Sequence, residues 1–392
     1  LQGAMDGLAR DSISRALVYA HPGRYDEGGA VARDTSNRVV FASGRVVRLK
    51  ALGGPENTFI VGAEDPDPAV ANDYGLGPNA TRCVTFLSAS HSVQGFTLTG
   101  GRSSVASDNS DVVGGRGGAA SAFAATGTGT FNAALLDCVV SNCVASRAAA
   151  MFGGTVDRCL LVDNVAVRGG NAITRTGVVR SSVYTRNLSS NTIVGQDSSA
   201  RNCTVVSNYC SNVQLSSGCD GTSNTVFAAN AERNDIDSAS KVGCCVYEKA
   251  SVTPNGSVKE TTLLADFLNG DFRPYAGSAG TYFGDPRAFA DGRCFADFNG
   301  KAFPIGPNGK ITAGAVSDLV LSMRVVPSVP GGTDIEGVVA TFPVTVTATC
   351  ADRQLLGFEV NGTTQTVAGA SVTITEDQAA DFTSFVVKPV YN

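Results

Sequence analysis

The chain has 392 residues, of which 43% are hydrophobic and 17% charged, with 45 glycines and a formal net charge of −5. It is long enough for two or three domains. Its acidic balance, without a run of Lys or Arg, excludes the basic surface of a nucleic-acid-binding protein. No segment reaches the roughly 18 consecutive apolar residues of a membrane span. No signal peptide is visible, and because the chain begins without Met we expect a processed piece of a longer precursor.

Residues 1–15 are predicted to form an N-terminal cap. Gln2 to Arg10 has the pattern of a short helix with polar faces. A stacked fold exposes apolar surface at its open end, and such a helix can cover it.

A repeat of roughly 22 residues dominates residues 16–316. Five segments align on a terminal Asn, at intervals of 21 to 23 residues: Asn142, Asn164, Asn187, Asn208 and Asn230. Each unit holds only short β-branched and apolar runs with turn residues, and lacks the long amphipathic stretch of a helical repeat. The sequence therefore predicts an all-β fold, a right-handed parallel β-helix whose coils stack at the ~4.8 Å strand spacing.

Side-chain alternation within each strand predicts which residues point inward. The position three residues before each Asn is always apolar, and we interpret it as the core column: Val139, Leu161, Tyr184, Val205 and Phe227. Asn tolerates the left-handed backbone of a tight turn, and its amide both donates and accepts hydrogen bonds. The five Asn residues are therefore predicted to stack as a structural ladder along the axis.

This pattern resembles the right-handed parallel β-helix superfamily that contains pectate lyases, polygalacturonases and many bacterial surface proteins. The segment from Ala16 to Glu27 is similar to the opening strand of such proteins. Gly53 to Gly62 and Ser92 to Gly101 resemble their early coils, and Asp266 to Ser278 resembles the segment that closes many of them. The resemblance implies a fold more than an activity, because this fold hosts many functions.

Two regions depart from the period. Arg102 to Thr130 is rich in Gly, Ala, Ser and Thr, and is predicted to be a lateral loop that carries a binding surface. Lys259 to Gly314 is less regular and is expected to close the C-terminal end of the solenoid.

Residues 317–392 are predicted to form a small β-sandwich-like or β-grasp-like module. Thr341 to Cys350 alternates as a half-buried antiparallel strand, and Asn361-Gly362 signals a hairpin. The segment from Gly357 to Gly362 resembles the internalin-type and other bacterial cell-wall repeat modules, although Glu359 stands where that family usually has Trp. The resemblance implies a spacer or anchor on a secreted or cell-surface protein.

The catalytic set of a polygalacturonase is missing, since neither His21 nor His91 lies between glycines. A lyase instead uses carboxylates that hold Ca²⁺ and an Arg or Lys that abstracts a proton. The candidate lyase residues are Asp163, Arg186, Arg158 and Arg180. The simpler interpretation of Asp163 and Arg186, on adjacent rungs, is a surface ion pair worth about 0–1 kcal/mol.

No cofactor is predicted except Ca²⁺, for which one acidic loop supplies candidate ligands: Glu64, Asp65, Asp67 and Asp73. The alternative is a solvated loop. Asp297 to Gly300 is a weaker case of the same kind. The eleven cysteines contain no C-x-x-C pair, which argues against a zinc site.

Two functions remain open. The first is a secreted or cell-surface protein with a structural or adhesive role, whose partners are other copies of itself or cell-surface components. The second is a polysaccharide lyase or glycan-binding protein that acts on acidic carbohydrate. Regular coils and missing catalytic residues favour the first, while the resemblance in fold supports the second.

Overall fold

The structure is a computed structural model. It describes residues 1–392 with the exception of 11–14, 33–34, 43–45, 70–73, 89, 105–112, 123–131, 169–171, 176, 217, 220, 232–233, 238–241, 251–255, 261–263, 275–282, 287–295, 304–309, 318–320, 326–334, 340–343, 349–354, 361–362, 366–370, 375–383 and 392. The chain divides into two compact units: Leu1–Thr261 with Tyr282–Ser317, and Thr262–Thr281 with Asp318–Asn392.

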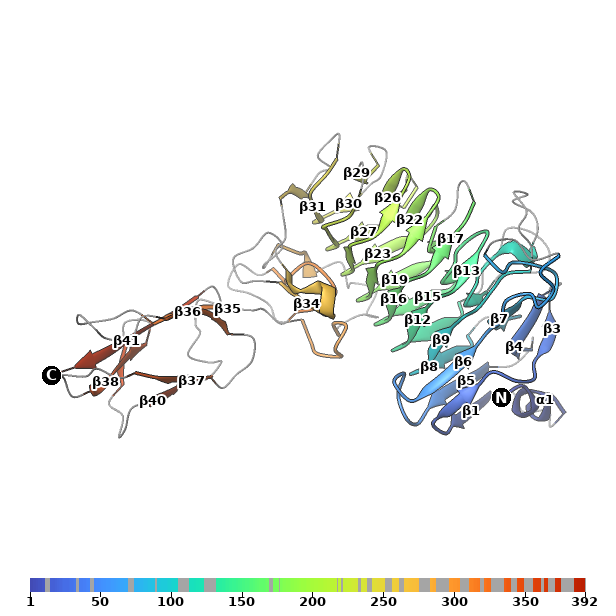
Figure 1. The fold of residues 1–392 in the computed structure, drawn as a ribbon, viewed down its shortest axis with the longest axis horizontal. Coiled ribbons are helices and arrows are strands. Elements are labelled where there is room, and N and C mark those ends of the chain that lie inside the picture. The colour runs from blue at the N-terminus through green and yellow to red at the C-terminus, as the bar shows by residue number, and fades with distance from the viewer. Residues whose placement is uncertain are drawn as a thin grey trace. The chain divides into compact units, whose positions relative to one another are not determined.

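The first unit is a parallel β-helix built from stacked rungs (Figure 1), which confirms the predicted fold. Sheet A contains β1 (Arg15–Ala20), β5 (Val46–Ala51), β8 (Ser92–Gln94), β11 (Ala134–Leu136), β15 (Thr155–Asp157), β19 (Val178–Arg180), β23 (Ser199–Arg201), β27 (Thr222–Ser223) and β30 (Val242–Gly243). Sheet B contains β2 (Gly23–Tyr25), β6 (Thr58–Val61), β9 (Thr97–Thr99), β12 (Val139–Ser141), β16 (Leu160–Val162), β20 (Val183–Thr185), β24 (Thr204–Val206), β28 (Val226–Ala228), β31 (Val246–Tyr247) and β32 (Val258–Lys259).

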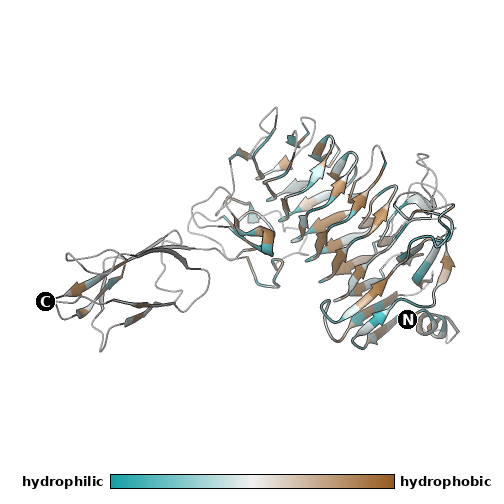
Figure 2. Ribbon diagram, in the orientation of Figure 1, coloured by the Kyte–Doolittle hydropathy of each residue, from teal (hydrophilic) through white to brown (hydrophobic). Residues whose placement is uncertain are grey.

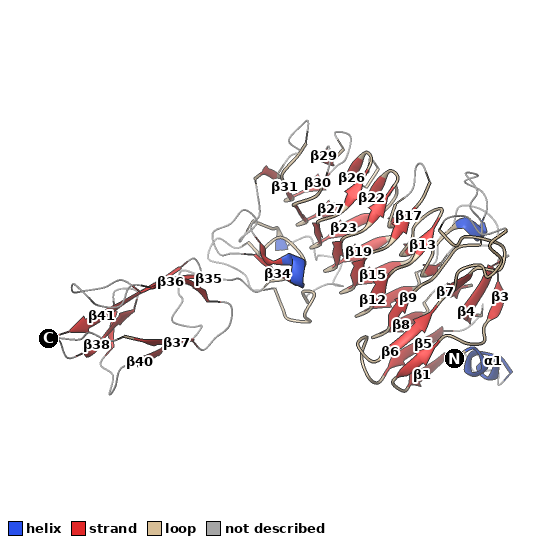
Figure 3. Ribbon diagram, in the orientation of Figure 1, coloured by secondary structure: helices blue, strands red, loops and turns tan. Residues whose placement is uncertain are grey.

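The remaining sheets complete each rung. Sheet C contains β3 (Ala30–Ala32), β4 (Thr35–Phe41), β7 (Thr81–Phe86), β10 (Ala120–Ser121), β14 (Met151–Phe152), β18 (Thr174–Arg175), β22 (Thr192–Val194), β26 (Val213–Leu215) and β29 (Asn234–Ile236). Sheet D contains β13 (Val144–Ala145), β17 (Val165–Ala166), β21 (Leu188–Ser189) and β25 (Tyr209–Cys210). All neighbours pair in parallel except β3 and β4. Strands dominate every rung, as Figure 3 shows.

From β8 to β28, left-handed residues turn the chain at two corners of each rung. The corner between sheets A and B is formed by Gly95, Asp137, Arg158, Ser181, Asn202, Asn224 and Cys244, all with positive φ. The corner between sheets B and D is formed by Gly100, Asn142, Asp163, Arg186, Ser207 and Ala229. From Asp137 onward, a small or amide side chain that is buried follows most of these corners, such as Cys159 after Arg158 and Asn187 after Arg186.

The core runs along the axis as one continuous cluster. Leu161, Tyr184, Val205 and Phe227 are each 0% exposed, as expected for the core column. Apolar strand residues recur in every rung (Figure 2). In the first repeat unit the column is Val140 rather than Val139, because Val140 pairs with Leu161 and is buried while Val139 is part-exposed.

The predicted Asn ladder exists from Asn164 to Asn230. The side-chain oxygen of Asn187 accepts from the main-chain N of Asn164 (3.0 Å), and that of Asn208 accepts from the main-chain N of Asn187 (3.0 Å). Asn230 continues the series at Asn208 (3.0 Å). Each Nδ2 also donates to a carbonyl of the preceding rung.

Asn142 does not belong to this ladder, and the prediction was wrong there. It is the exposed left-handed corner residue, with φ +52°, and it is equivalent to Asp163. Cys143 occupies the ladder position, where its main-chain N donates to the side-chain oxygen of Asn164 (3.1 Å). Aligning the repeat on its terminal Asn displaced the first unit by one residue, which moves every side chain to the other face.

The cap helix α1 (Gln2–Arg10) confirms the predicted N-terminal element. Met5 is buried, and Leu1 and Leu8 pack against the solenoid core. The side-chain oxygen of Gln2 accepts from the main-chain N of Val40 in β4 (2.7 Å). The helix therefore lies against the first rungs through apolar contacts and one tether.

The described residues between 283 and 317 pack laterally on the rungs. Ser181 donates to the carbonyl of Ala296 (2.8 Å), Asn224 exchanges hydrogen bonds with Asp285, and Ala315 N donates to Thr204 Oγ1 (2.9 Å). These contacts lie along the corner between sheets A and B, whereas the sequence suggested closure of the C-terminal end.

Between β9 and β11, much of the predicted lateral loop lies outside the described residues. Its described part contains the 3₁₀ turn η1 (Val113–Gly115) and β10, which pairs with β7 and β14. β10 is therefore a strand of sheet C and not part of a lateral loop.

The second unit is a small β structure. Its strands are β33 (Leu264–Asp266), β34 (Asp271–Pro274), β35 (Leu321–Val325), β36 (Ile335–Val339), β37 (Val344–Thr347), β38 (Leu355–Val360), β39 (Thr363–Gln365), β40 (Ser371–Ile374) and β41 (Ser384–Tyr391), with a 3₁₀ turn η2 (Phe267–Asn269). Pairing is antiparallel except between β35 and β41. In β37, Val346 is buried and Thr345 exposed, as the predicted alternation requires.

Candidate functional site

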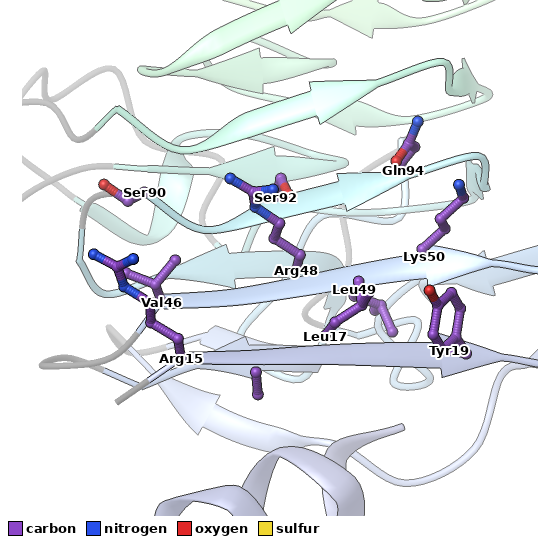
Figure 4. Close-up of a pocket in the computed structure, with 11 residues that line it drawn as sticks. Arg15, Leu17, Tyr19, Val46, Arg48, Leu49, Lys50, Ser90, Ser92 and Gln94 are labelled. Carbon is purple, nitrogen blue, oxygen red and sulfur yellow. The ribbon is translucent and has the colours of Figure 1, made fainter. Parts of the chain in front are cut away.

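A groove of about 700 Å³ lies on the outer face of sheet A at β1, β5 and β8 (Figure 4). Alternation along these strands decides its lining, because Arg15, Leu17 and Tyr19 of β1 point outward while Ala20 is buried. In β5, Arg48 and Lys50 are exposed, while the alternate residues Val47 and Leu49 face the core. The lining consists of Arg15, Ala16, Leu17, Tyr19, Val46, Arg48, Leu49, Lys50, Ser90, Ser92 and Gln94.

Strand register sets these side chains in columns. Leu17 pairs with Arg48, which pairs with Ser92. Tyr19 pairs with Lys50, which pairs with Gln94. Figure 4 shows Tyr19 beside Lys50 on the neighbouring strand. Neighbouring strands lie about 4.7–4.9 Å apart, so one ligand can contact a whole column.

Arg15, Lys50 and Arg48, the three cations of the groove, have no acidic partner among the described residues. Elsewhere in the part of the chain that the structure describes, Arg side chains form ion pairs, such as Arg24 with Asp26 (2.7 Å) and Arg102 with Glu64 (2.8 Å). None of the described acidic residues pairs with Arg15, Arg48 or Lys50, and none of them lines the groove. This local positive charge stands on a chain whose net charge is −5.

Two large apolar surfaces complement the cations. Leu17 is 53% exposed and Tyr19 is 54% exposed. Side chains of this size normally bury apolar area on folding, so two of them in one groove indicate a contact surface. Tyr combines an apolar ring with a hydrogen-bonding hydroxyl.

His91 supports the groove from below. It is 1% exposed, its Nδ1 accepts from the main-chain N of Val47 (3.1 Å), and its Nε2 lies 3.2 Å from the carbonyl of Ala42. Burial lowers the pKa of this imidazole from its usual value. The neutral ring thus ties β5 to the chain between Ser90 and Ser92, both of which line the groove.

The lyase candidates divide into two separate places. Asp163 and Arg186 form a bidentate ion pair (2.9 Å) at the corner between sheets B and D, with side chains 40% and 48% exposed. This is the surface pair that the simpler interpretation predicted.

Arg158 and Arg180 meet instead at the corner between sheets A and B. Arg158 Nε donates to Asp137 (2.6 Å), and Asp157 pairs in register with Arg180. Burial raises the pKa of the Asp157 carboxyl, against the opposing effect of the two Arg. Gln94 donates to Asp137 (2.7 Å), which links this cluster to the rim of the groove.

The Ca²⁺ candidates are engaged in local structure. Asp65 accepts from the main-chain N of Asp67 (3.0 Å) and Asn79 (2.8 Å), and these bonds lower its pKa. Asp67 accepts from Ala69 N (2.9 Å), and Glu64 pairs with Arg102. Asp73 lies outside the described residues.

The second acidic segment, Asp297 to Gly300, is likewise engaged in internal hydrogen bonds. Asp297 is 0% exposed and accepts from Asn299, Lys301 and Ser317. Among the residues with described placement, no group of three or more His, Cys, Asp or Glu side chains is arranged to hold a metal ion.

Sequence reasoning did not single out the groove. Its signal was present in the alternation of Arg15, Leu17 and Tyr19 and of Val46, Arg48 and Lys50. The pairing of β1 with β5 and β8 spans long insertions, however, so the columns could not be assembled from the repeat.

Comparisons with known proteins leave the family open. No family model matches the chain, and no curated protein matches it. Among solved structures, it is similar to a mutant of the alginate lyase AlyGC of family PL6, at 9% identity and a TM-score of 0.24. The match covers 71% of this chain and 55% of the lyase, so the chain spans little more than half of that protein. We draw no functional conclusion from this likeness.

No helix in the described ranges is both long and apolar enough to span a bilayer.

Proposed function

We propose that this protein is a secreted or cell-surface β-helix that binds acidic polysaccharide along the outer face of sheet A, without cleaving it. The observation that carries the proposal is the groove at β1, β5 and β8, in which three cations without a described acidic partner lie beside two exposed apolar side chains.

The chemistry of the lining favours a sugar acid over a neutral glycan. Arg48 presents a planar fork that matches a carboxylate, and Lys50 presents a point charge. Tyr19 and Leu17 offer flat apolar area to the faces of sugar rings. Ser92 and Gln94 supply hydrogen-bonding groups to hydroxyls. Arg48 and Lys50, two residues apart in one strand, are separated by about 6.6 Å, so successive acidic groups of a polymer can reach both.

Binding without cleavage is favoured by what surrounds the cations. Among the described residues, the groove lining contains no carboxylate that could hold Ca²⁺ beside these cations, as a lyase of this kind requires. The candidate lyase residues Arg158 and Arg186 are held by carboxylates at two other corners of the rungs.

The second unit supports a role on a surface. We propose that residues 317–392 act as an internalin-type spacer or anchor, on the basis of the Gly357 to Gly362 pattern and the small β structure. A variant with Arg48→Ala and Lys50→Ala should then still sediment with isolated cell walls while losing polysaccharide binding. If this variant lost both cell-wall sedimentation and polysaccharide binding, the two units would not have separate roles.

The direct test is affinity for a polyuronate, compared with a neutral glucan, by calorimetry. Arg48→Ala with Lys50→Ala should weaken polyuronate binding by about tenfold or more, since exposed charge contacts contribute up to about 1 kcal/mol each. The matched control is Arg186→Ala, which removes an exposed cation outside the groove. Equal affinity of the double variant and the control would overturn the site. Formation of an unsaturated product, detected by its ultraviolet absorbance, would contradict the proposal that the protein does not cleave the polysaccharide.

A further inference from the structure

None of the described strands pairs with the outer edge of β1, which is an edge of sheet A. In sheet A this strand pairs only with β5, and none of the described strands lies on its other side. The cap helix α1 packs against β4 of sheet C. β1 has six residues and no Pro, and Arg15 is its one charged residue. Natural proteins protect edge strands from pairing with Pro, bulges or charges, and β1 has little of this protection.

The main-chain hydrogen bonding of β1 decides which groups face the open edge. Leu52 N donates to the carbonyl of Ala20 (2.9 Å), so Ala20 faces the next rung. The N–H and C=O of one strand residue point to the same edge, and successive residues alternate. Arg15, Leu17 and Tyr19 therefore direct their main-chain groups away from β5, toward the open side.

The sequence of β1 is complementary to itself in the antiparallel direction. If two copies meet with Leu17 opposite Leu17, Arg15 lies opposite Tyr19 at both ends. All three positions then form the hydrogen-bonded pairs of an antiparallel ladder, because these are the residues whose N–H and C=O face outward. The same register places Arg15 beside an aromatic ring, an arrangement that attracts a cation.

We propose that β1 is a docking edge for a second copy of this chain, which joins sheet A of the two copies into one continuous sheet. The two-fold contact uses the same surface on both copies, as closed dimers do. Leu17 and Tyr19, each more than half exposed in one copy, would be covered on their edge side. The two grooves would then form one groove with six cations, and a polyanion would favour the dimer by lying across both.

This proposal does not depend on what fills the groove, because it concerns the main-chain edge. The test is sedimentation of the full chain over a concentration series. We expect a dimer, and Leu17→Lys should raise its dissociation constant at least about tenfold by placing like charges directly opposite one another. The matched control is Leu52→Lys, since Leu52 is also 53% exposed but lies beyond the end of β5. A monomeric parent chain, or equal association of both variants, would overturn the proposal.

A covalent readout separates loss of docking from loss of folding. In the proposed register the two Leu17 Cα atoms are about 5.5 Å apart, within the roughly 4.4–6.8 Å range of a disulfide. Leu17→Cys should therefore form an intermolecular disulfide in air, each pair of thiols losing two electrons and two protons to oxygen, while Leu52→Cys should not. Equal crosslinking of the two variants would contradict the register.

Discussion

Asn208 binds three rungs at once. Its Nδ2 donates to the carbonyls of Tyr184 (3.0 Å) and Val206 (3.0 Å), its Oδ1 accepts from Asn187, and its main-chain N donates to Asn230. The side chain is 1% exposed. A buried polar group that loses its partners costs about 1–3 kcal/mol, so the ladder holds the rungs together only as long as each amide is present.

Asn208→Ala should therefore destabilise the solenoid by at least about 2 kcal/mol, because several partners lose their bonds together. Asn142→Ala is the control, since Asn142 is exposed and outside the ladder. Its expected cost is about 1 kcal/mol, from the left-handed conformation alone. Chemical denaturation of both variants measures the difference, and equal losses would show that the amide column carries no special stability.

The burial of His91 leads us to predict that the stability of the protein depends on pH. Its folded-state pKa is lowered by burial, so the unfolded chain binds a proton more readily than the native protein. Stability from this group is complete above pH ~6.5. It is lost progressively as the pH falls from there toward the lowered folded value. The melting temperature of His91→Gln should fall less than that of the parent across this interval. Parallel melting curves for the two proteins would contradict it.

At the scale of the element, corners and close stacking determine what a rung tolerates. Gly62, Gly101 and Gly118 approach neighbouring rungs so closely that an added Cβ would meet backbone atoms. At Gly101 the nearest obstacles are the carbonyl of Gly118 and, at 3.0 Å, the sulfur of Cys83. These turns have no room for a side chain because adjacent rungs lie one strand spacing apart.

Gly101→Ala should consequently destabilise the protein by about 1–3 kcal/mol, the usual range for an overpacked core. Gly243→Ala is a suitable comparison, since no atom lies within 4 Å of the Cβ position there. Thermal unfolding of both variants tests the close stacking, which would be refuted by an unchanged melting temperature for Gly101→Ala.

The exposed pair Asp163–Arg186 should contribute little. Removing both charges, as Asp163→Asn with Arg186→Gln, is expected to change stability by less than about 1 kcal/mol and to leave polyuronate affinity unaltered. A reduced affinity for polyuronate, measured by calorimetry, would show that these two residues contribute to binding.

At the scale of the whole molecule, the repeat period of the sequence was sufficient to predict the β-helix. Asn164, Asn187, Asn208 and Asn230 recur because each rung has the same two corners. The alignment failed at Asn142, since Cys143 fills the ladder position of that rung. A pattern based on one residue type cannot detect such a replacement.

The groove could not be predicted in the same way. Arg15 pairs with Val46, and Arg48 with Ser92, so the first rungs contain 31 and 44 residues instead of roughly 22. Because of insertions of this length, the pairing register of these strands cannot be inferred from the sequence. The charged columns of Arg48 and Lys50 therefore appear only when the strands are placed side by side.

Lysine footprinting by mass spectrometry tests the central claim most directly. The parent chain is acetylated with and without a polyuronate, and Lys50 is compared with Lys259, an exposed lysine on β32. We predict that the polyuronate protects Lys50 by several fold while Lys259 reacts equally in both samples, and that a neutral glucan protects neither. Equal reactivity of Lys50 with and without saturating polyuronate would contradict the binding face on sheet A.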